Sequence, residues 1–113
     1  YELGLPKGRI EKGEPALDAA NRELKEEIGY GAHDLREINA FSLAPGYMTH
    51  LTHIILAQDL YEEKLEGDEP EALDVVPWPM TDLQSLAERD DCTEGRSIAA
   101  LYFARDYLNS ETP

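Results

Sequence analysis

The chain has 113 residues, of which 42% are apolar, and its formal net charge is −14. This length and apolar content suit a single domain with one core. Nucleic acid and anionic membranes both require clustered basic side chains, so the acidic composition argues against either as a partner. The single cysteine, Cys92, excludes an internal disulfide and fits a reducing compartment. With no apolar run of membrane-spanning length and no visible signal peptide, we expect a cytoplasmic protein.

The first feature along the chain is a pair of turns ahead of a helix. Residues 5–8 read as a strand end followed by a turn, and Gly13 belongs to a second turn. A main-chain carbonyl at Lys7 or Gly8 is a candidate oxygen ligand for a metal ion. Lys7 and Arg9 stand beside an acidic segment, where phosphate oxygens would need cationic partners.

A helix is predicted over residues 15–28. Pro15 suits the first helical turn, Glu14 or Gly13 can precede it as the cap, and Gly29 favours a left-handed stop. Apolar residues recur at helical spacing and predict one apolar stripe: Leu17, Ala20, Leu24 and Ile28.

Three carboxylates share another face of this helix, because Glu23, Glu26 and Glu27 are three and four residues apart. In a partly buried cleft their repulsion would reach roughly 4 kcal/mol per close pair. A hard divalent cation removes that repulsion, and oxygen-only ligands favour Mg²⁺, with Mn²⁺ as a substitute. Arg22 is expected to orient Glu14 or Glu23 through a salt bridge. The alternative is a surface helix whose charges are simply solvated.

The remaining elements are read from periodicity and from their flanking turn residues. Strands are predicted at 38–43, 51–60 and 73–78, and helices at 83–88 and 96–108.

Two loops between these elements carry candidate functional residues. Tyr47 lies in the first loop, where its ring either stacks on a base or ribose or anchors the loop. Residues 66–71 form a second acidic cluster that reads as a surface loop.

Residues 8–30 also match a known pattern, G-x5-E-x7-R-E-U-x-E-E-x-G-U, in which U is a bulky apolar residue. The matching positions are Gly8, Glu14, Arg22, Glu23, Leu24, Glu26, Glu27 and Gly29. This is the Nudix box, so the chain resembles the Nudix hydrolases, which cleave nucleoside diphosphates linked to another moiety. The match in register favours the metal site over the solvated surface helix.

The resemblance implies an α/β (α+β) fold, the Nudix α/β/α sandwich around a mixed central sheet. We expect residues 1–113 to be one Nudix domain, its C-terminal portion, because strands normally precede the box and here the chain opens almost on it. The resemblance also implies a homodimer.

Beyond the box, Pro45 follows Gly29 by sixteen residues, as is typical of the ADP-ribose-cleaving subgroup. This resemblance implies Mg²⁺-dependent hydrolysis of ADP-ribose, NADH and diadenosine triphosphate with release of AMP. It makes Pro45 and Tyr47 candidates for contacting the substrate.

By the same resemblance, Glu23 and Glu27 are the principal metal ligands and Glu26 assists them. In this subgroup a glutamate on a late loop supplies the general base or a further metal ligand, and Glu69 and Glu71 match that position.

Two other functions stay open at this point. Some Nudix domains bind nucleotides without cleaving them, as sensor modules, but a binding-only domain has no need of the full acidic triplet. An isomerase of isopentenyl diphosphate is a third possibility, although such proteins use a divergent box. Metal-dependent release of AMP separates the hydrolase from both.

Overall fold

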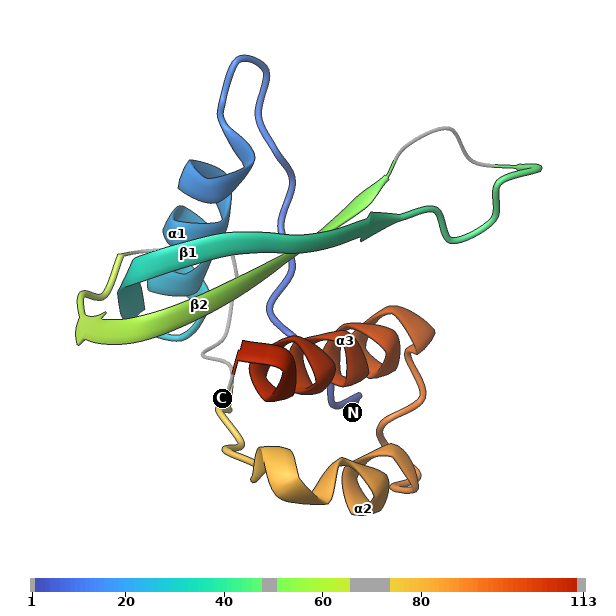
Figure 1. Ribbon diagram of the computed structural model, residues 1–113. Helices are drawn as coiled ribbons and strands as arrows, with labels where there is room; N and C mark the ends of the chain where they lie inside the picture. Colours follow the sequence, from blue (N-terminus) through green and yellow to red (C-terminus); the bar gives the residue numbers. More distant parts are fainter. Residues whose placement is uncertain (1, 48–50, 66–73, 112–113) are drawn as a thin grey trace. The chain divides into compact units, whose positions relative to one another are not determined.

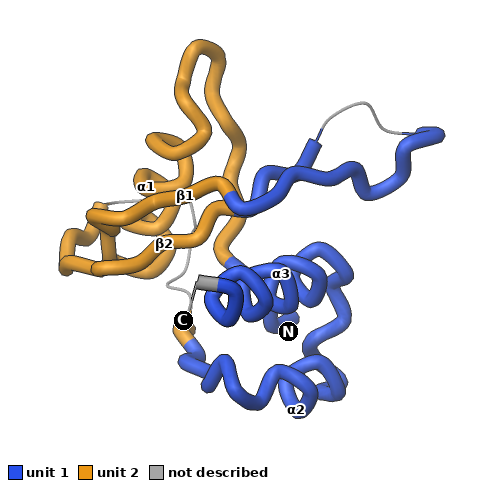
Figure 2. The backbone as a smooth tube through the Cα atoms, viewed as in Figure 1, with its two compact units in different colours: residues 1–5, 38–54, 76–113 blue, residues 6–37, 55–75 orange. Residues whose placement is uncertain are grey.

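The computed structural model describes residues 2–47, 51–65 and 74–111, which form three α-helices, one short 3-10 helix and two strands (Figure 1). The predicted α+β class is confirmed. The chain falls into two compact units (Figure 2). Unit 1 comprises residues 1–5, 38–54 and 76–113, and unit 2 comprises residues 6–37 and 55–75. We describe each by itself, and the assignment of residues 1–113 to one domain stays a prediction.

Helix α1 (Ala16–Glu27) of unit 2 carries the box residues from Arg22 to Glu27. Pro15 is its N-cap, and no side chain caps the first turn, so the prediction of Glu14 or Gly13 as the cap is wrong. The carboxylate of Glu14 binds Arg22 instead. At the other end Gly29 has the predicted left-handed conformation (φ +89), and its N–H donates to the Leu24 carbonyl at 3.0 Å.

Strands β1 (Tyr30–Phe41) and β2 (Thr52–Glu62) pair in an antiparallel two-stranded sheet (Figure 1). β2 agrees with the strand predicted at 51–60. β1 begins eight residues before the strand predicted at 38–43, because Tyr30–Glu37 has little apolar alternation and is ordered by pairing with β2.

Side-chain hydrogen bonds dock α1 on this sheet. Asn21 accepts a hydrogen bond from the buried Ala32 N–H at 2.9 Å through Oδ1, and its Nδ2 donates to the Tyr61 hydroxyl at 3.5 Å. The Tyr61 ring lies over Gly31, where an added Cβ would come within 2.5 Å of it. Within the predicted apolar stripe, Leu17 is still 37% exposed, and the buried residue of the helix is Ala19, which lies outside that stripe.

Unit 1 contains the 3-10 helix η1 (Met80–Asp82), helix α2 (Leu83–Ala87) and helix α3 (Gly95–Glu111). Both predicted helices are confirmed, and their packing buries a small core of Leu83, Leu86 and Cys92. The strand predicted at 73–78 is wrong, because residues 74–78 form no strand. Trp78 packs against the core and donates its Nε1–H to the Asp82 carbonyl at 2.7 Å.

No helix in the described part of the chain combines the length and the apolar composition that crossing a membrane requires.

Candidate functional site

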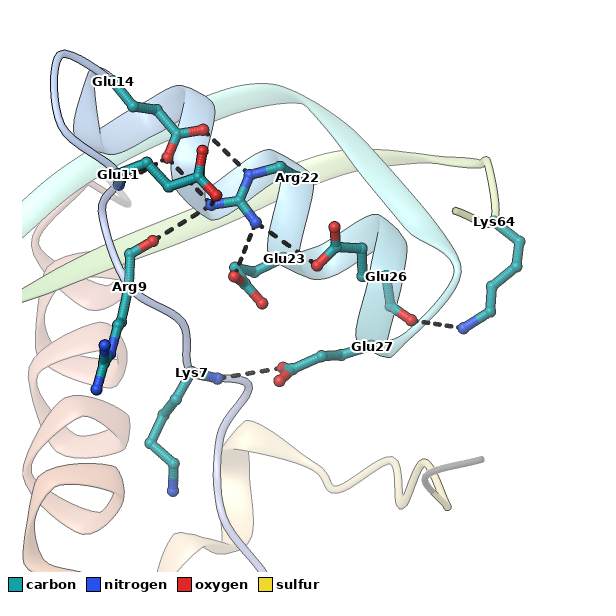
Figure 3. A network of polar contacts seen from close by, with 9 residues as sticks. All are labelled: Lys7, Arg9, Glu11, Glu14, Arg22, Glu23, Glu26, Glu27 and Lys64. Carbon is teal, nitrogen blue, oxygen red and sulfur yellow. Dashed lines mark hydrogen bonds and ion pairs between the residues drawn. The ribbon is translucent and has the colours of Figure 1, made fainter. Parts of the chain in front are cut away.

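Arg22 is the centre of a network that joins the turn before α1 to the acidic face of the helix (Figure 3). Its Nε and one terminal nitrogen bind both oxygens of Glu14, at 3.1 and 3.0 Å. The other terminal nitrogen lies 2.9 Å from Glu23 and 3.6 Å from Glu26. The guanidinium also donates to the Arg9 carbonyl at 3.2 Å. The predicted salt bridge from Arg22 to Glu14 or Glu23 is therefore confirmed for both carboxylates, and it extends to Glu26.

This ion pair shifts the acidity of both partners. Hydrogen bonds from the Arg22 side chain and from the Glu11 N–H lower the pKa of the Glu14 carboxyl below its ordinary value. The hydrogen bond to Glu14 is also the main cause that raises the pKa of Arg22. The bidentate geometry explains why an arginine suits this position, since the planar guanidinium grips both carboxylate oxygens at once.

The turn before the helix approaches the carboxylates closely. The main-chain N–H of Lys7 donates to Glu27 Oε2 at 3.2 Å. Gly8 lies so near the Glu23 side chain that a Cβ at Gly8 would overlap its Cδ. Figure 3 shows the side chains of Lys7 and Arg9 extending away from Arg22. Six of the predicted site residues thus lie in unit 2: Lys7, Gly8, Arg9, Glu23, Glu26 and Glu27.

Whether these residues suit a divalent metal depends on donor chemistry and on access. In the described ranges no group of three or more acidic, histidine or cysteine side chains is arranged to hold a metal ion. The reason is visible in the contacts, since Glu23 and Glu26 turn toward Arg22 and Glu27 toward the Lys7 N–H. The donors themselves fit a hard cation, because all are oxygens. Since Gly8 has no side chain, its backbone can lie next to the Glu23 carboxylate.

The sequence reading missed a second set of contacts, at the C-terminal end of α1. Lys64 donates from Nζ to the Glu26 carbonyl at 2.6 Å, and the Leu65 N–H donates to the Lys25 carbonyl at 3.2 Å. Lys25 also pairs with Glu63 at 3.0 Å, and this hydrogen bond is the main cause that raises the pKa of Lys25. These partners are 38 to 40 residues apart, so no local pattern in the sequence reveals them.

Two further predicted site residues lie in the other unit. Pro45 and Tyr47 lie in unit 1, in a turn closed by the Tyr47 N–H on the Ala44 carbonyl at 2.9 Å. Tyr47 is 94% exposed, so its ring anchors nothing in the described residues and stays a candidate for stacking. Glu69 and Glu71 lie outside the described residues.

Comparison with known proteins identifies the class to which this fold and site belong. The sequence profile of the NUDIX domain matches residues 1–101, so the chain belongs to the Nudix family. The Nudix fold predicted from the box is confirmed by a crystal structure of an ADP compounds hydrolase, which matches with a TM-score of 0.94 at 48% sequence identity. The match covers 99% of this chain and 60% of the other.

Two curated relatives narrow the similarity further. The chain is 49% identical over 111 residues to the ADP compounds hydrolase NudE of Escherichia coli, covering 98% of this chain and 60% of that protein. It is 37% identical over 101 residues to the ADP-ribose pyrophosphatase of Bacillus subtilis, covering 88% of this chain and 55% of that one. The chain thus spans little more than half the length of these relatives, and the name of the second agrees with the ADP-ribose-cleaving subgroup predicted from Pro45.

Proposed function

We propose that this protein is a Mg²⁺-dependent pyrophosphohydrolase that cleaves ADP-linked metabolites and releases AMP. The observation that carries the proposal is the acidic face of α1, where Arg22 pairs with Glu23 and Glu26 and the backbone at Gly8 lies against the Glu23 side chain. The 49% identity to an ADP compounds hydrolase and the 37% identity to an ADP-ribose pyrophosphatase support the substrate class.

In this proposal Glu23 and Glu27 are the principal ligands of Mg²⁺, and Glu26 and the Gly8 carbonyl assist. Mn²⁺ is an acceptable substitute because the donors are all oxygens. When bound, the cation polarises the phosphoryl oxygens and neutralises the charge that develops on them. The cation is also needed for binding, because a chain of net charge −14 would otherwise repel a diphosphate.

The chain's own residues divide the remaining work. Arg22 fixes the Glu23 carboxylate through its contact at 2.9 Å, and the Lys7 N–H fixes Glu27 at 3.2 Å. The side chains of Lys7 and Arg9 are proposed to bind phosphate oxygens. Glu69 or Glu71 is proposed to take the proton from the attacking water, and Pro45 and Tyr47 to contact the nucleoside.

The preferred substrates are proposed to be ADP-ribose, NADH and diadenosine triphosphate, without a ranking among them. By family resemblance we further propose a homodimer in the cytoplasm, which light scattering and fractionation would test.

The function is tested on the full-length protein with each of the three substrates, with and without Mg²⁺. The nucleotide products are separated by chromatography. AMP is expected only with metal. Glu27→Gln should lower its release by about 100-fold or more, because even residues that only support a metal ligand change metal affinity 10–100-fold. The matched control is Glu62→Gln, at an exposed position on β2, which should leave the rate unchanged.

Two results would contradict the proposal. Tight binding of the nucleotides with no turnover under any metal would mean a sensor domain, and the roles given above would be withdrawn. Equal activity in Glu27→Gln and wild type would remove the acidic face of α1 from the reaction. Full kcat in both Glu69→Gln and Glu71→Gln would remove only the assignment of the base.

A further inference from the structure

The last turn of α1 is held by the three residues that follow strand β2. The Glu63 N–H donates to the Gly29 carbonyl at 3.0 Å, Lys64 Nζ donates to the Glu26 carbonyl at 2.6 Å, and the Leu65 N–H donates to the Lys25 carbonyl at 3.2 Å. We call residues 63–65 the clamp. The carbonyls of Lys25 and Glu26 belong to the last turn of the helix, where carbonyls have no partner within the helix, and that of Gly29 follows the helix end.

The contact made by Lys64 has a particular place relative to the carboxylates. The carbonyl of Glu26 belongs to the peptide unit that joins Glu26 to Glu27, so the ammonium group holds the backbone between two proposed metal ligands (Figure 3). A cation at this end of a helix is also favoured by the helix dipole. The Lys64 stem lies beside Gly29, where an added Cβ would be 3.5 Å from its Cδ.

The opposite side of the same turn is fixed as well. Lys25 reaches back to Glu63 at 3.0 Å and lies 5.6 Å from the centre of the Tyr61 ring. Lys64 and Leu65 therefore bind the backbone of this turn, and Glu63 binds the side chain of Lys25. Glu26 and Glu27 project from a helix end that has little freedom to unwind.

We propose that Lys64 is a positioning residue for the proposed metal site: by fixing the Glu26 carbonyl it sets the directions of the Glu26 and Glu27 carboxylates. This inference rests on the proposed function, and it adds a residue outside the Nudix box that acts on two residues within it. Its effect should appear in metal affinity, since Lys64 contacts the backbone of the ligands.

The test uses the full-length protein with Mn²⁺ alone as the probe. Binding is read from the electron paramagnetic resonance signal of Mn²⁺. Lys64→Met removes the ammonium and keeps most of the stem, and it should weaken Mn²⁺ binding by about tenfold, as residues supporting metal ligands typically do. Lys64→Arg keeps a donor and should bind Mn²⁺ within about twofold of wild type. Lys12→Met removes an equal charge from an exposed turn and should leave Mn²⁺ binding unchanged.

A second measurement separates positioning from general stability. Amide hydrogen exchange at Ile28 and Gly29, which both donate to the Leu24 carbonyl, should become about two- to fivefold faster in Lys64→Met. At saturating metal, KM for ADP-ribose should stay near the wild-type value, because no residue of the clamp is among those proposed to bind the nucleotide.

The outcomes are separable. If wild type binds Mn²⁺ and releases AMP but Lys64→Met binds Mn²⁺ as tightly, the positioning role is overturned and the proposed function stands. Faster exchange without weaker Mn²⁺ binding overturns it too, since Lys64 would then only stabilise the helix end. If wild type neither binds Mn²⁺ nor releases AMP, the proposed function itself fails and the inference fails with it.

Discussion

Replacing Gly8 by alanine places a methyl group where the Glu23 side chain lies. The added Cβ would overlap Cδ of Glu23 and come close to Cγ and Oε1. Because ordinary contact begins near 3.4 Å, the Glu23 carboxylate must move by about 1 Å or more. The obstacle is the far end of a flexible side chain, so the glutamate can move aside.

The two consequences of that movement differ greatly in size. Turning Glu23 away from its preferred rotamer costs about 1 kcal/mol, and alanine lowers the entropy of the unfolded chain by a comparable amount. The free energy of unfolding should therefore change by less than about 1 kcal/mol. For a proposed metal ligand, however, a misplacement of about 1 Å lowers kcat by about 100-fold.

The assay is AMP release from ADP-ribose as a function of Mg²⁺, together with thermal unfolding of the same protein. Gly95→Ala is the matched control, because nothing lies within 4 Å of a Cβ there, and it should keep full activity. Gly8→Ala with unchanged kcat and unchanged dependence on Mg²⁺ would refute the reasoning. A large loss of stability would refute it in a different way, by showing that Glu23 cannot move aside.

Three further predictions concern stability and reactivity. The ionised carboxylate of Glu14 stabilises the fold at pH values above its ordinary pKa of 4.5, and this contribution is lost as the pH falls through the pKa that Arg22 lowers. Glu14→Gln should therefore flatten the decline of Tm between about pH 5 and 3. Leu86 is 6% exposed, and Leu86→Ala should lower the free energy of unfolding in urea by about 2–5 kcal/mol, whereas a wild-type stability would contradict the core assignment. Burial raises the pKa of the Cys92 thiol, so Ellman's reagent should modify it quickly only after denaturation, and rapid labelling of the native protein would count against its burial.

The elements that could be predicted are those whose signals are local. Helix α1 is predicted to within one residue at each end, because Pro15 fixes φ at its start and Gly29 permits the left-handed conformation that ends it. The bond between Arg22 and Glu14 spans eight residues, about two helical turns, and could also be read from spacing. The strand at 73–78 was wrong, because apolar and β-branched residues favour extended chain without specifying a partner strand.

The features that could not be predicted depend on residues far apart in the chain. β1 starts at Tyr30 because pairing with β2 orders a polar segment that has little strand pattern of its own. Gly31 is needed only because the Tyr61 ring lies over it. The hydrogen bond from Lys64 to Glu26 joins residues 38 apart. No periodicity in the sequence carries that information.

The pairing of Arg22 with Glu14 keeps both of these groups charged over a wide range of pH. Mutual hydrogen bonding moves the pKa of Glu14 further down and that of Arg22 further up, so neither group changes charge between about pH 6 and 10. The scaffold that orders Glu23 is thus electrically constant while a reaction is studied. Each limb of a pH–rate profile recorded in that range therefore reports the titration of a group other than Arg22 and Glu14. Such a profile is a direct way to find the proton acceptor.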